Sequence, residues 1–227
     1  MGDAIAASRK AVGVKRALFL TGGWEGHEPA ETTAIVATAL EARGFHTEVA
    51  TRIAALEDGD HLRGFDLIVP NWTMGTLTDA AERALLDAVA AGTGIAGWHG
   101  GLADAFRDRT AFQFMVGGQF VAHPGDAVRY DVRLLPTPDG LLDGIDDFQL
   151  TSEQYYLHVD PSNEVLATTT FSGEHVAWIA GTVMPVAWRR RWGAGKVFYS
   201  SPGHGVRDFA VREVLELTVR GLHWAAR

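Results

Sequence analysis

Apolar residues recur along the first hundred positions with two different periods, and the two periods alternate. Short apolar runs bounded by Gly, Pro or polar residues predict buried strands. The segments between them repeat apolar residues at helical spacing, with Pro29 or Thr78 at the start and Gly44 or Gly92 past the end. The predicted strands are 16–21, 45–50, 65–70 and 95–98, and the predicted helices are 29–43 and 78–91. Strands that alternate with helices form a parallel sheet covered on both faces.

The second half of the chain has a different pattern. Residues 127–135 alternate apolar and polar side chains, which is typical of a half-buried strand. Three more strands are predicted at 164–171, 184–188 and 196–200, followed by an amphipathic helix at 208–226. We therefore expect an α/β fold with an antiparallel portion between residues 124 and 190.

Length and composition narrow the class of protein. The 227 residues, of which 47% are hydrophobic, fit one domain at 15–227 after a loose arm at 1–14. A net charge of −8 argues against a nucleic-acid partner, and we interpret Arg189-Arg190-Arg191 as a solvated strand end or turn. We find no signal peptide and no run of ~18 apolar residues, so we expect a cytoplasmic protein without a membrane partner. With 0 Cys, disulfides and cysteine nucleophiles are excluded.

The predicted strands end in turns that carry histidines and tryptophans. Ligands of open parallel sheets bind where the carboxyl ends of the strands meet. The side chains expected at this edge are Trp24, His27, Trp72, Trp98, His99 and His204. Aromatic walls with convergent polar groups suit a small polar ligand such as a sugar. The alternative for each tryptophan is a core position that caps its strand.

His99 stands in the turn Gly97-Trp98-His99-Gly100-Gly101, directly after a predicted strand. This pattern has the outline of a nucleophile elbow, in which a strained turn between strand and helix projects one side chain over the sheet. An imidazole at that point can act as an acid, a base or a metal ligand. The alternative is a buried histidine whose nitrogens are satisfied by the backbone.

Three other histidines also adjoin Gly or Pro, which places them on tight loops: His27, His123 and His204. Loop histidines can hold a divalent metal such as zinc, and His99, His123 and His204 are the candidate ligands. Without a metal, the same groups serve as acids, bases or hydrogen-bonding contacts. Glu153, two residues before Tyr155, is either a general base with a positioning phenol or an ordinary exposed carboxylate.

Several motifs, in this order along the chain, resemble the trehalose-utilisation (ThuA-like) family. They are GWHGG at 97–101, GGQF at 117–120 with His123-Pro124, SEQYY at 152–156, PVAW at 185–188, GAGKVFY at 193–199 and Gly203-His204. The resemblance extends from about residue 16 to the C-terminal helix. It implies a three-layer α/β fold, flavodoxin-like or class I glutamine amidotransferase-like, with helices on both faces of a mainly parallel sheet.

The resemblance also implies roles for single residues. True amidotransferases carry a Cys at the elbow, where this chain has His99, so glutamine hydrolysis should be absent. His204 matches the position of the triad histidine. The family pattern Asp-Glu-x-Tyr has Ser152 in place of the Asp but keeps Glu153 and Tyr155.

The family is associated with the breakdown of disaccharides and with oxidised (3-keto) sugars. We therefore expect a sugar-processing isomerase, lyase or hydrolase that uses His/Glu acid–base or metal-assisted chemistry. The expected catalytic residues are His99, Glu153 and His204, and the expected ligand contacts are Trp24, His27, Trp72, Trp98, His123 and Tyr155. The alternative is a non-catalytic carbohydrate-binding or regulatory protein on the same scaffold. The sequence leaves open whether Trp178, Trp188 and Trp192 line the pocket or an interface of a homo-oligomer.

Overall fold

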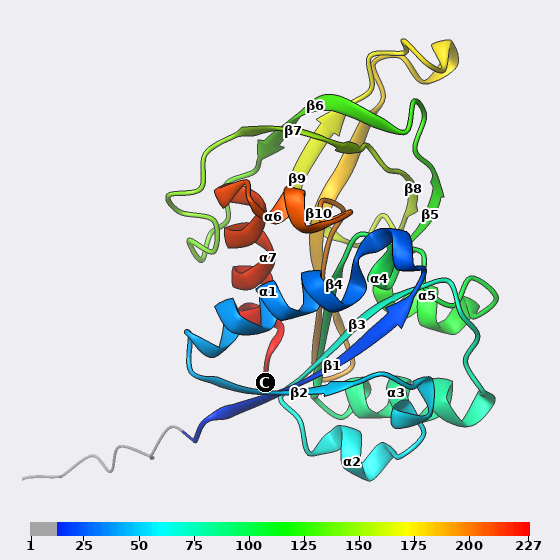
Figure 1. Ribbon diagram of the computed structural model, residues 1–227, viewed down its shortest axis with the longest axis vertical. Coiled ribbons are helices and arrows are strands. Elements are labelled where there is room, and N and C mark those ends of the chain that lie inside the picture. Colours follow the sequence, from blue (N-terminus) through cyan, green and yellow to red (C-terminus); the bar gives the residue numbers. More distant parts are fainter. Residues whose placement is uncertain (1–12) are drawn as a thin grey trace, which may run out of the picture.

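The computed structural model describes residues 13–227, so the arm predicted at 1–14 lies almost wholly outside the described residues. Nine strands form one sheet in the order β2-β1-β3-β4-β11-β10-β9-β6-β7, and β5 pairs with β8 in a separate two-stranded sheet (Figure 1). The strands are β1 Lys15–Gly23, β2 Phe45–Ala50, β3 Leu67–Thr73, β4 Gly94–Trp98, β5 Gly118–Ala122, β6 Ala127–Leu134, β7 Phe148–Glu153, β8 Tyr156–Val159, β9 Glu164–Thr170, β10 Val183–Trp192 and β11 Gly195–Ser200.

Helices lie against both faces of this sheet (Figure 1). The α-helices are α1 Pro29–Glu41, α2 Gly59–Arg63, α3 Asp79–Ala90, α4 Gly100–Ala103, α5 Thr110–Val116, α6 Val206–Phe209 and α7 Arg212–Ala225. Three short 3-10 helices are η1 Glu25–His27, η2 Ile53–Leu56 and η3 Ala177–Ile179. Helices α1 and α7 pack on one face, and α3 and α5 pack on the other. The predicted α/β fold with helices on both faces is therefore confirmed.

The sheet has a parallel part and an antiparallel part. β1 runs parallel to β2 and β3, and β4 runs parallel to β3 and β11. The partners of β10, β9, β6 and β7 are all antiparallel. The predicted antiparallel portion is thus present, and the loop between β9 and β10 projects beyond the body of the molecule (Figure 1).

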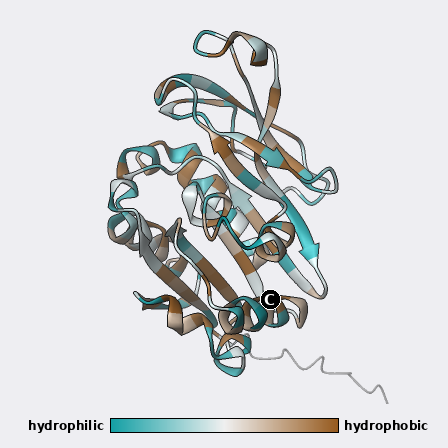
Figure 2. Ribbon diagram, turned by 90° about the vertical axis from the view of Figure 1, so that its right-hand side faces the viewer, coloured by the Kyte–Doolittle hydropathy of each residue, from teal (hydrophilic) through white to brown (hydrophobic). Residues whose placement is uncertain are grey.

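Alternation of side chains along the central strands fills both cores. Leu18 faces the core under α3 and α5, while the next residue, Phe19, faces the core under α1 and α7. On β11, Val197 likewise faces the core under α3 and α5, and Phe198 faces the core under α1 and α7. Apolar colouring accordingly concentrates on the central strands (Figure 2). A strand buried on both faces must be apolar at successive positions, which explains the continuous runs in the sequence.

Several elements differ from their prediction. Strands β5, β7 and β8 and the short helices α2, α4 and α5 were not predicted, and the helix expected at 208–226 is divided into α6 and α7. Of the solvated strand end or turn predicted at 189–191, the strand end is correct, because these residues lie close to the end of β10, but Arg189 is not solvated. Arg189 is buried and pairs with Glu164 at 2.6 Å and Asp139 at 2.6 Å, and these carboxylates offset the cost of desolvating its charge.

The three late tryptophans have separate environments. Trp188 is fully buried, and its Nε1 donates a hydrogen bond to the Val116 carbonyl at 2.9 Å. Trp192 packs edge-on against Phe114, whereas Trp178, in η3, is 88% exposed. Trp188 is therefore a core residue. Among the described residues, no helix has the length and apolar character needed to cross a lipid bilayer.

Helix α7 packs closely on β11 at Gly221, which limits the side chains that this position can hold. A Cβ at Gly221 would lie 2.1 Å from Cζ of Phe198, a buried ring without room to move. Gly221→Ala should therefore destabilise the protein by about 1–3 kcal/mol, although alanine favours an isolated helix. Urea unfolding measures this effect. Gly59→Ala in α2, whose nearest neighbour is the flexible Arg63 guanidinium at 3.3 Å, is the control and should be neutral. Equal stability of the two variants would contradict the packing argument.

Candidate functional site

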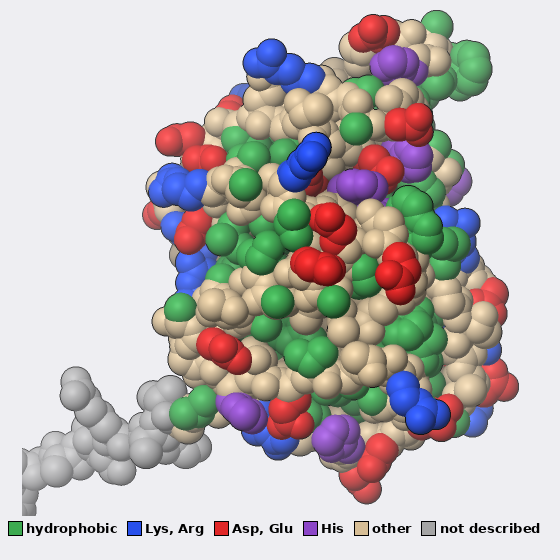
Figure 3. Space-filling model, in the orientation of Figure 1, with side chains coloured by type: hydrophobic (Ala, Val, Ile, Leu, Met, Phe, Trp, Pro, Cys, Tyr) green, Lys and Arg blue, Asp and Glu red, His purple; other side chains and the backbone are tan. Residues whose placement is uncertain are grey.

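Four side chains from distant parts of the chain meet at the carboxyl ends of the parallel strands. They are His27, His99, Glu153 and His204, and one ligand atom from each lies within 4.8 Å of those of the other three. His27 ends η1 after β1, His99 follows β4, and His204 follows β11, while Glu153 ends β7. His27, His99 and Glu153 are buried, and at the surface histidine and acidic side chains lie near one another below the projecting β9–β10 loop (Figure 3).

The backbone at His99 has the strained turn that the glycine pattern predicts. His99 has φ 51° and ψ −129°, and it separates β4 from α4. Its N–H donates to the Ser200 carbonyl at 2.8 Å, and its own carbonyl accepts from the Tyr199 hydroxyl at 2.9 Å. A Cβ at Gly100 would lie 2.4 Å from Thr73 Oγ1. The glycine is therefore required by close approach of the chain to β3.

Hydrogen bonding fixes which nitrogen of His99 faces the site. Nδ1 lies 2.8 Å from the Ser201 carbonyl oxygen, which can only accept, so Nδ1 carries the proton. Nε2 then faces Glu153 Oε2 at 3.2 Å and His204 Nδ1 at 3.4 Å. The backbone satisfies only one nitrogen of this 1% exposed side chain, and the other is directed into the cluster.

Glu153 is 9% exposed, which excludes the ordinary exposed carboxylate considered from the sequence. Its Oε2 lies 3.3 Å from His204 Nδ1 as well as beside His99. Burial would raise the pKa of Glu153, but hydrogen bonds and positive charge from His204 and His99 outweigh it and hold the pKa below its ordinary value. The hydrogen bond to Glu153 in turn raises the pKa of His204. Glu153 therefore remains a carboxylate.

His27 has the opposite electrostatic environment. Burial, followed by the charges of His99 and His204, lowers the pKa of His27 to about 3. Its Nδ1 lies 2.7 Å from Thr73 Oγ1. Its ring makes edge contacts with Trp24, with centroids 4.7 Å apart, and with His99 at 4.5 Å. His27 is consequently a neutral imidazole held in one orientation at neutral pH.

Asp208 connects strand β7, which carries Glu153, to the loop that carries His204. This buried carboxylate accepts hydrogen bonds through Oδ2 from Ser152 Oγ at 2.7 Å and from the backbone N–H groups of Gly203 and His204 at 2.9 Å. Ser152, which stands where the family pattern has an Asp, thus supplies a donor next to Glu153. Three hydrogen bonds to one charged acceptor fix the loop that presents His204.

A pocket of about 180 Å³ opens beside this cluster. Its wall includes five residues expected from the sequence: Trp24, His27, His123, Glu153 and Tyr155. The Tyr155 ring lies against His99, with centroids 4.1 Å apart, and burial raises the pKa of Tyr155 well above its ordinary value. Tyr155 is therefore a neutral hydrogen-bond donor. Sequence reasoning missed the other wall residues, which are Thr73, Met74, Asp104, Arg107 and Phe120.

Two tryptophans expected at the site lie elsewhere. Trp98 is 1% exposed and packs edge-on against Phe209 in the core, with ring centroids 5.6 Å apart. Trp72 packs over Gly22 and Gly75, where an added Cβ would lie 2.4 Å and 2.5 Å from its ring. Trp72 points away from Thr73, because neighbouring residues of a strand point to opposite faces, and Trp98 ends β4 in the core under α1 and α7. The expectation that both line the pocket is therefore corrected.

The residues that could bind a metal in the structure differ from those expected from the sequence. His123 lies at the pocket, but its Nε2 is 3.8 Å from Glu153 Oε1, and its Nδ1 is 3.4 Å from Asp126 Oδ1. It is not one of the four residues whose ligand atoms converge. His27 and Glu153 complete the set with His99 and His204 instead. The candidate ligands named from the sequence thus included two of these four residues.

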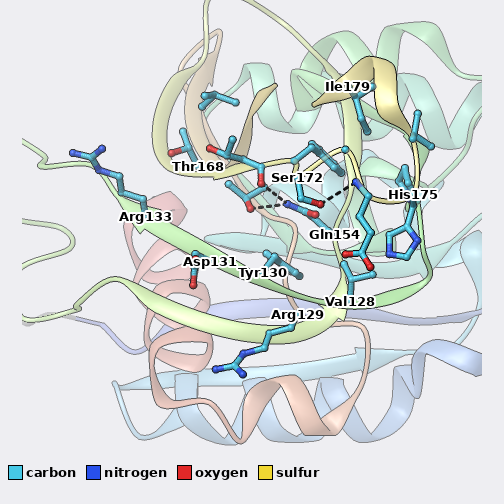
Figure 4. Close-up of a pocket in the computed structure, with 18 residues that line it drawn as sticks. Val128, Arg129, Tyr130, Asp131, Arg133, Gln154, Thr168, Ser172, His175 and Ile179 are labelled. Atoms are coloured by element: carbon cyan, nitrogen blue, oxygen red, sulfur yellow. Dashed lines mark hydrogen bonds between the residues drawn. The ribbon is translucent and has the colours of Figure 1, made fainter. Parts of the chain in front are cut away.

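A larger pocket of about 400 Å³ lies under the β9–β10 loop and does not contain the four clustered residues (Figure 4). Gln154 in its wall is buried and donates to Thr169 Oγ1 at 2.8 Å. The other polar groups that line it come mainly from β6 and from residues 172–175. Of these two pockets, we place the candidate site at the smaller, because His27, Glu153 and His204, whose pKa values are shifted, converge there.

The lowered pKa of His27 makes stability depend on pH. In the metal-free protein His27 is neutral when folded, whereas below pH ~6.5 the unfolded chain binds the proton. Stability should therefore fall as pH drops from 6.5 to 5, by at most about 1.4 kcal/mol per pH unit for this group. His204, whose pKa is raised, contributes its full stabilisation throughout this range, and Glu153 titrates below it.

Urea unfolding at pH 6.5 and pH 5, with chelator present, tests whether the lowered pKa of His27 causes this loss of stability. His27→Gln should flatten the slope, while the exposed His46→Gln should keep it. A slope that is the same in His27→Gln and the parent protein would contradict it.

Solved structures share this fold at low sequence identity. A ThuA-like protein from Bacteroides uniformis superposes with a TM-score of 0.78 at 18% identity, covering 96% of this chain and 94% of that one. A ThuA-like protein from Parabacteroides merdae gives 0.73 at 17% identity, with 93% and 89% covered. The cytoplasmic protein STM1381 from Salmonella typhimurium gives 0.67 at 12%, with 93% and 100% covered. No curated protein matches the sequence.

The sequence itself matches one family model. The model is ThuA, described as trehalose utilisation, and it covers residues 16–225. Apart from Lys15, this range includes every strand of the sheet, and it includes all four residues of the cluster. The chain therefore belongs to the ThuA family.

Proposed function

We propose that this protein is a metal-assisted enzyme of sugar catabolism, acting on a disaccharide such as trehalose after one ring has been oxidised to a 3-keto sugar. The family description supports a disaccharide, and the aromatic pocket next to acid–base groups supports a sugar ring. The main support for a metal is the spacing of the ligand atoms in the cluster.

Three ligand atoms form a nearly equilateral triangle. The separations are 3.2 Å for His99 Nε2 to Glu153 Oε2, 3.3 Å for Glu153 Oε2 to His204 Nδ1, and 3.4 Å for His204 Nδ1 to His99 Nε2. Zinc binds nitrogen and oxygen at ~2.0–2.1 Å, so two ligands of a tetrahedral site are ~3.3 Å apart. Hydrogen bonds between such atoms are usually shorter, at ~2.7–3.2 Å. The spacing thus favours a cation between them.

Outer contacts of the histidines also fit a metal site. Metal-binding histidines usually donate their second N–H to a carbonyl or another fixed acceptor, which leaves the first nitrogen free for the metal. His99 donates to the Ser201 carbonyl, and His27 is held by Thr73. Three imidazoles with one carboxylate suit zinc or a similar divalent ion. His27, His99, Glu153 and His204 would hold it.

The proposed reaction begins with removal of a proton next to the keto group. A bound cation would supply Lewis-acid stabilisation of the enolate oxygen. Oε1 of Glu153, which is not part of the triangle, lies on the side of His123 and can accept the proton. The electron pair left on carbon then forms a C=C bond and expels the glycosidic oxygen, which takes up a proton.

His123 is suited to exchange the abstracted proton with solvent. Its side chain is 33% exposed, and its Nε2 lies 3.8 Å from Glu153 Oε1. Tyr155, kept neutral by burial, can donate a hydrogen bond to a sugar oxygen. The elbow carries His99 instead of a cysteine, so we propose that glutamine hydrolysis is absent. We also propose a cytoplasmic location, as the name of the Salmonella relative states for that protein.

Elemental analysis of the purified protein tests the metal directly. We expect about one equivalent of a divalent transition metal, lost in His99→Ala and His204→Ala because each removes one of the three ligand atoms of the triangle. His123→Ala should keep the metal, because His123 does not belong to the converging set. Circular dichroism controls for folding. Absence of metal from the folded parent protein would exclude a metal-assisted reaction and leave acid–base chemistry by Glu153 and His204.

Turnover of 3-ketotrehalose, followed by release of the second sugar, tests the reaction. Glu153→Gln keeps the shape of the side chain but removes the base, so turnover should fall by about 10²-fold or more. His46→Gln, far from the cluster on β2, should leave turnover unchanged. If the metal-loaded protein binds the sugar without turnover, a non-catalytic binding protein is the correct description.

A further inference from the structure

We propose that the Asp104–Arg107 pair is the substrate-recognition element of this pocket and that it binds two neighbouring hydroxyl groups of one sugar ring. The inference rests on the proposed function in taking the ligand to be a sugar. Both residues line the pocket, together with Trp24 and Phe120.

The pair has a fixed geometry in which Arg107 offers two parallel donors to one carboxylate. Arg107 Nε lies 2.5 Å from Asp104 Oδ1, and Nη2 lies 2.8 Å from Oδ2. The Asp104 side chain is 6% exposed, whereas that of Arg107 is 52% exposed. Nη1 of Arg107 makes no hydrogen bond within residues 13–227. The carboxylate is therefore held in the wall, while a donor of the guanidinium remains available to a ligand.

The loop that carries the pair is attached to the end of β3 by two backbone hydrogen bonds. The Met74 N–H donates to the Asp104 carbonyl at 2.8 Å, and the Phe106 N–H donates to the Met74 carbonyl at 3.0 Å. Met74 and Phe106 have φ values of 61° and 48°, in the left-handed region that costs a non-glycine residue about 1 kcal/mol or more. Such strain persists where surrounding contacts fix the backbone, and here it fixes Asp104 relative to the pocket.

Further contact fixes the backbone of Arg107. Gln113 Nε2, from α5, donates to the Arg107 carbonyl at 2.7 Å. The guanidinium also lies over the Phe120 ring, 5.8 Å from its centroid. These contacts hold the pair in place without a ligand. A recognition group held in advance loses little entropy on binding.

The charges of the pair select the chemical class of the ligand. A free arginine in a pocket attracts carboxylates and phosphates, but Asp104 neutralises Arg107. A hydroxyl group both donates and accepts, so neighbouring hydroxyls can donate to Asp104 and accept from Arg107. The apolar C–H faces of a sugar ring suit contact with Trp24 and Phe120. The pocket volume of about 180 Å³ corresponds to ~6 water molecules, which leaves room for one ring.

The same type of pair elsewhere in the chain has none of these features. Arg63 and Asp60 also pair at i,i+3, but the Asp60 side chain is 92% exposed and lies outside the pocket. This pair is an ordinary exposed ion pair. It therefore supplies a matched control for the Asp104–Arg107 pair.

Calorimetric titration with trehalose and its monodeoxy analogues tests the proposal. The parent protein should bind at least one analogue about 10-fold or more weakly than trehalose, because the missing hydroxyl leaves the pair without its partner. Arg107→Lys and Asp104→Asn should bind trehalose about 10-fold more weakly while binding that analogue as the parent does. Arg63→Lys should keep the parent pattern.

Two results of the titration distinguish loss of the Asp104–Arg107 recognition role from failure of the proposed sugar-processing function. Variants at 104 and 107 that bind trehalose like the parent, or that weaken every sugar equally, would overturn the recognition role. Failure of the metal-loaded parent to bind any sugar would instead overturn the proposed function, and the recognition role with it. Metal content and thermal unfolding of each variant confirm that the His cluster and the fold are intact.

Discussion

The buried carboxylate of Glu153 is the constraint on which the site depends. A charge that is 9% exposed needs compensation, and in this chain it comes from imidazoles contributed by separate loops. Local contacts hold these imidazoles next to Glu153. The strained turn directs His99, the Ser201 carbonyl fixes its tautomer, and Asp208 holds the loop of His204 beside the strand of Glu153. Together they leave one space bordered by nitrogen and oxygen atoms.

Much of this arrangement could be predicted because parallel strands end at one edge. Glycines next to His27, His99 and His204 indicated turns at that edge, and the structure brings these side chains together. The two misplaced tryptophans could also have been recognised from the sequence. Trp98 is the last residue of a strand buried on both faces, so its ring is expected in a core, whereas His99 belongs to the turn beyond that strand.

Other features had no signal in a single sequence. Asp104 and Arg107 belong to no motif, and only the pairing of Met74 with the chain around Ala105 brings them to the pocket. Strand β7 alternates Phe148, Leu150 and Ser152 inward, yet its short polar sequence resembles a loop. Long-range pairing at the antiparallel end decides its conformation, because tertiary contacts override weak local preference.

We propose that three imidazoles and one carboxylate hold one metal ion. X-ray absorption at the metal edge of the purified protein tests this site most directly. The account predicts one ion with nitrogen and oxygen neighbours at ~2.0–2.1 Å and an outer pattern from several imidazole rings. A bound ion surrounded only by water or carboxylate oxygens, with no imidazole pattern, would contradict it.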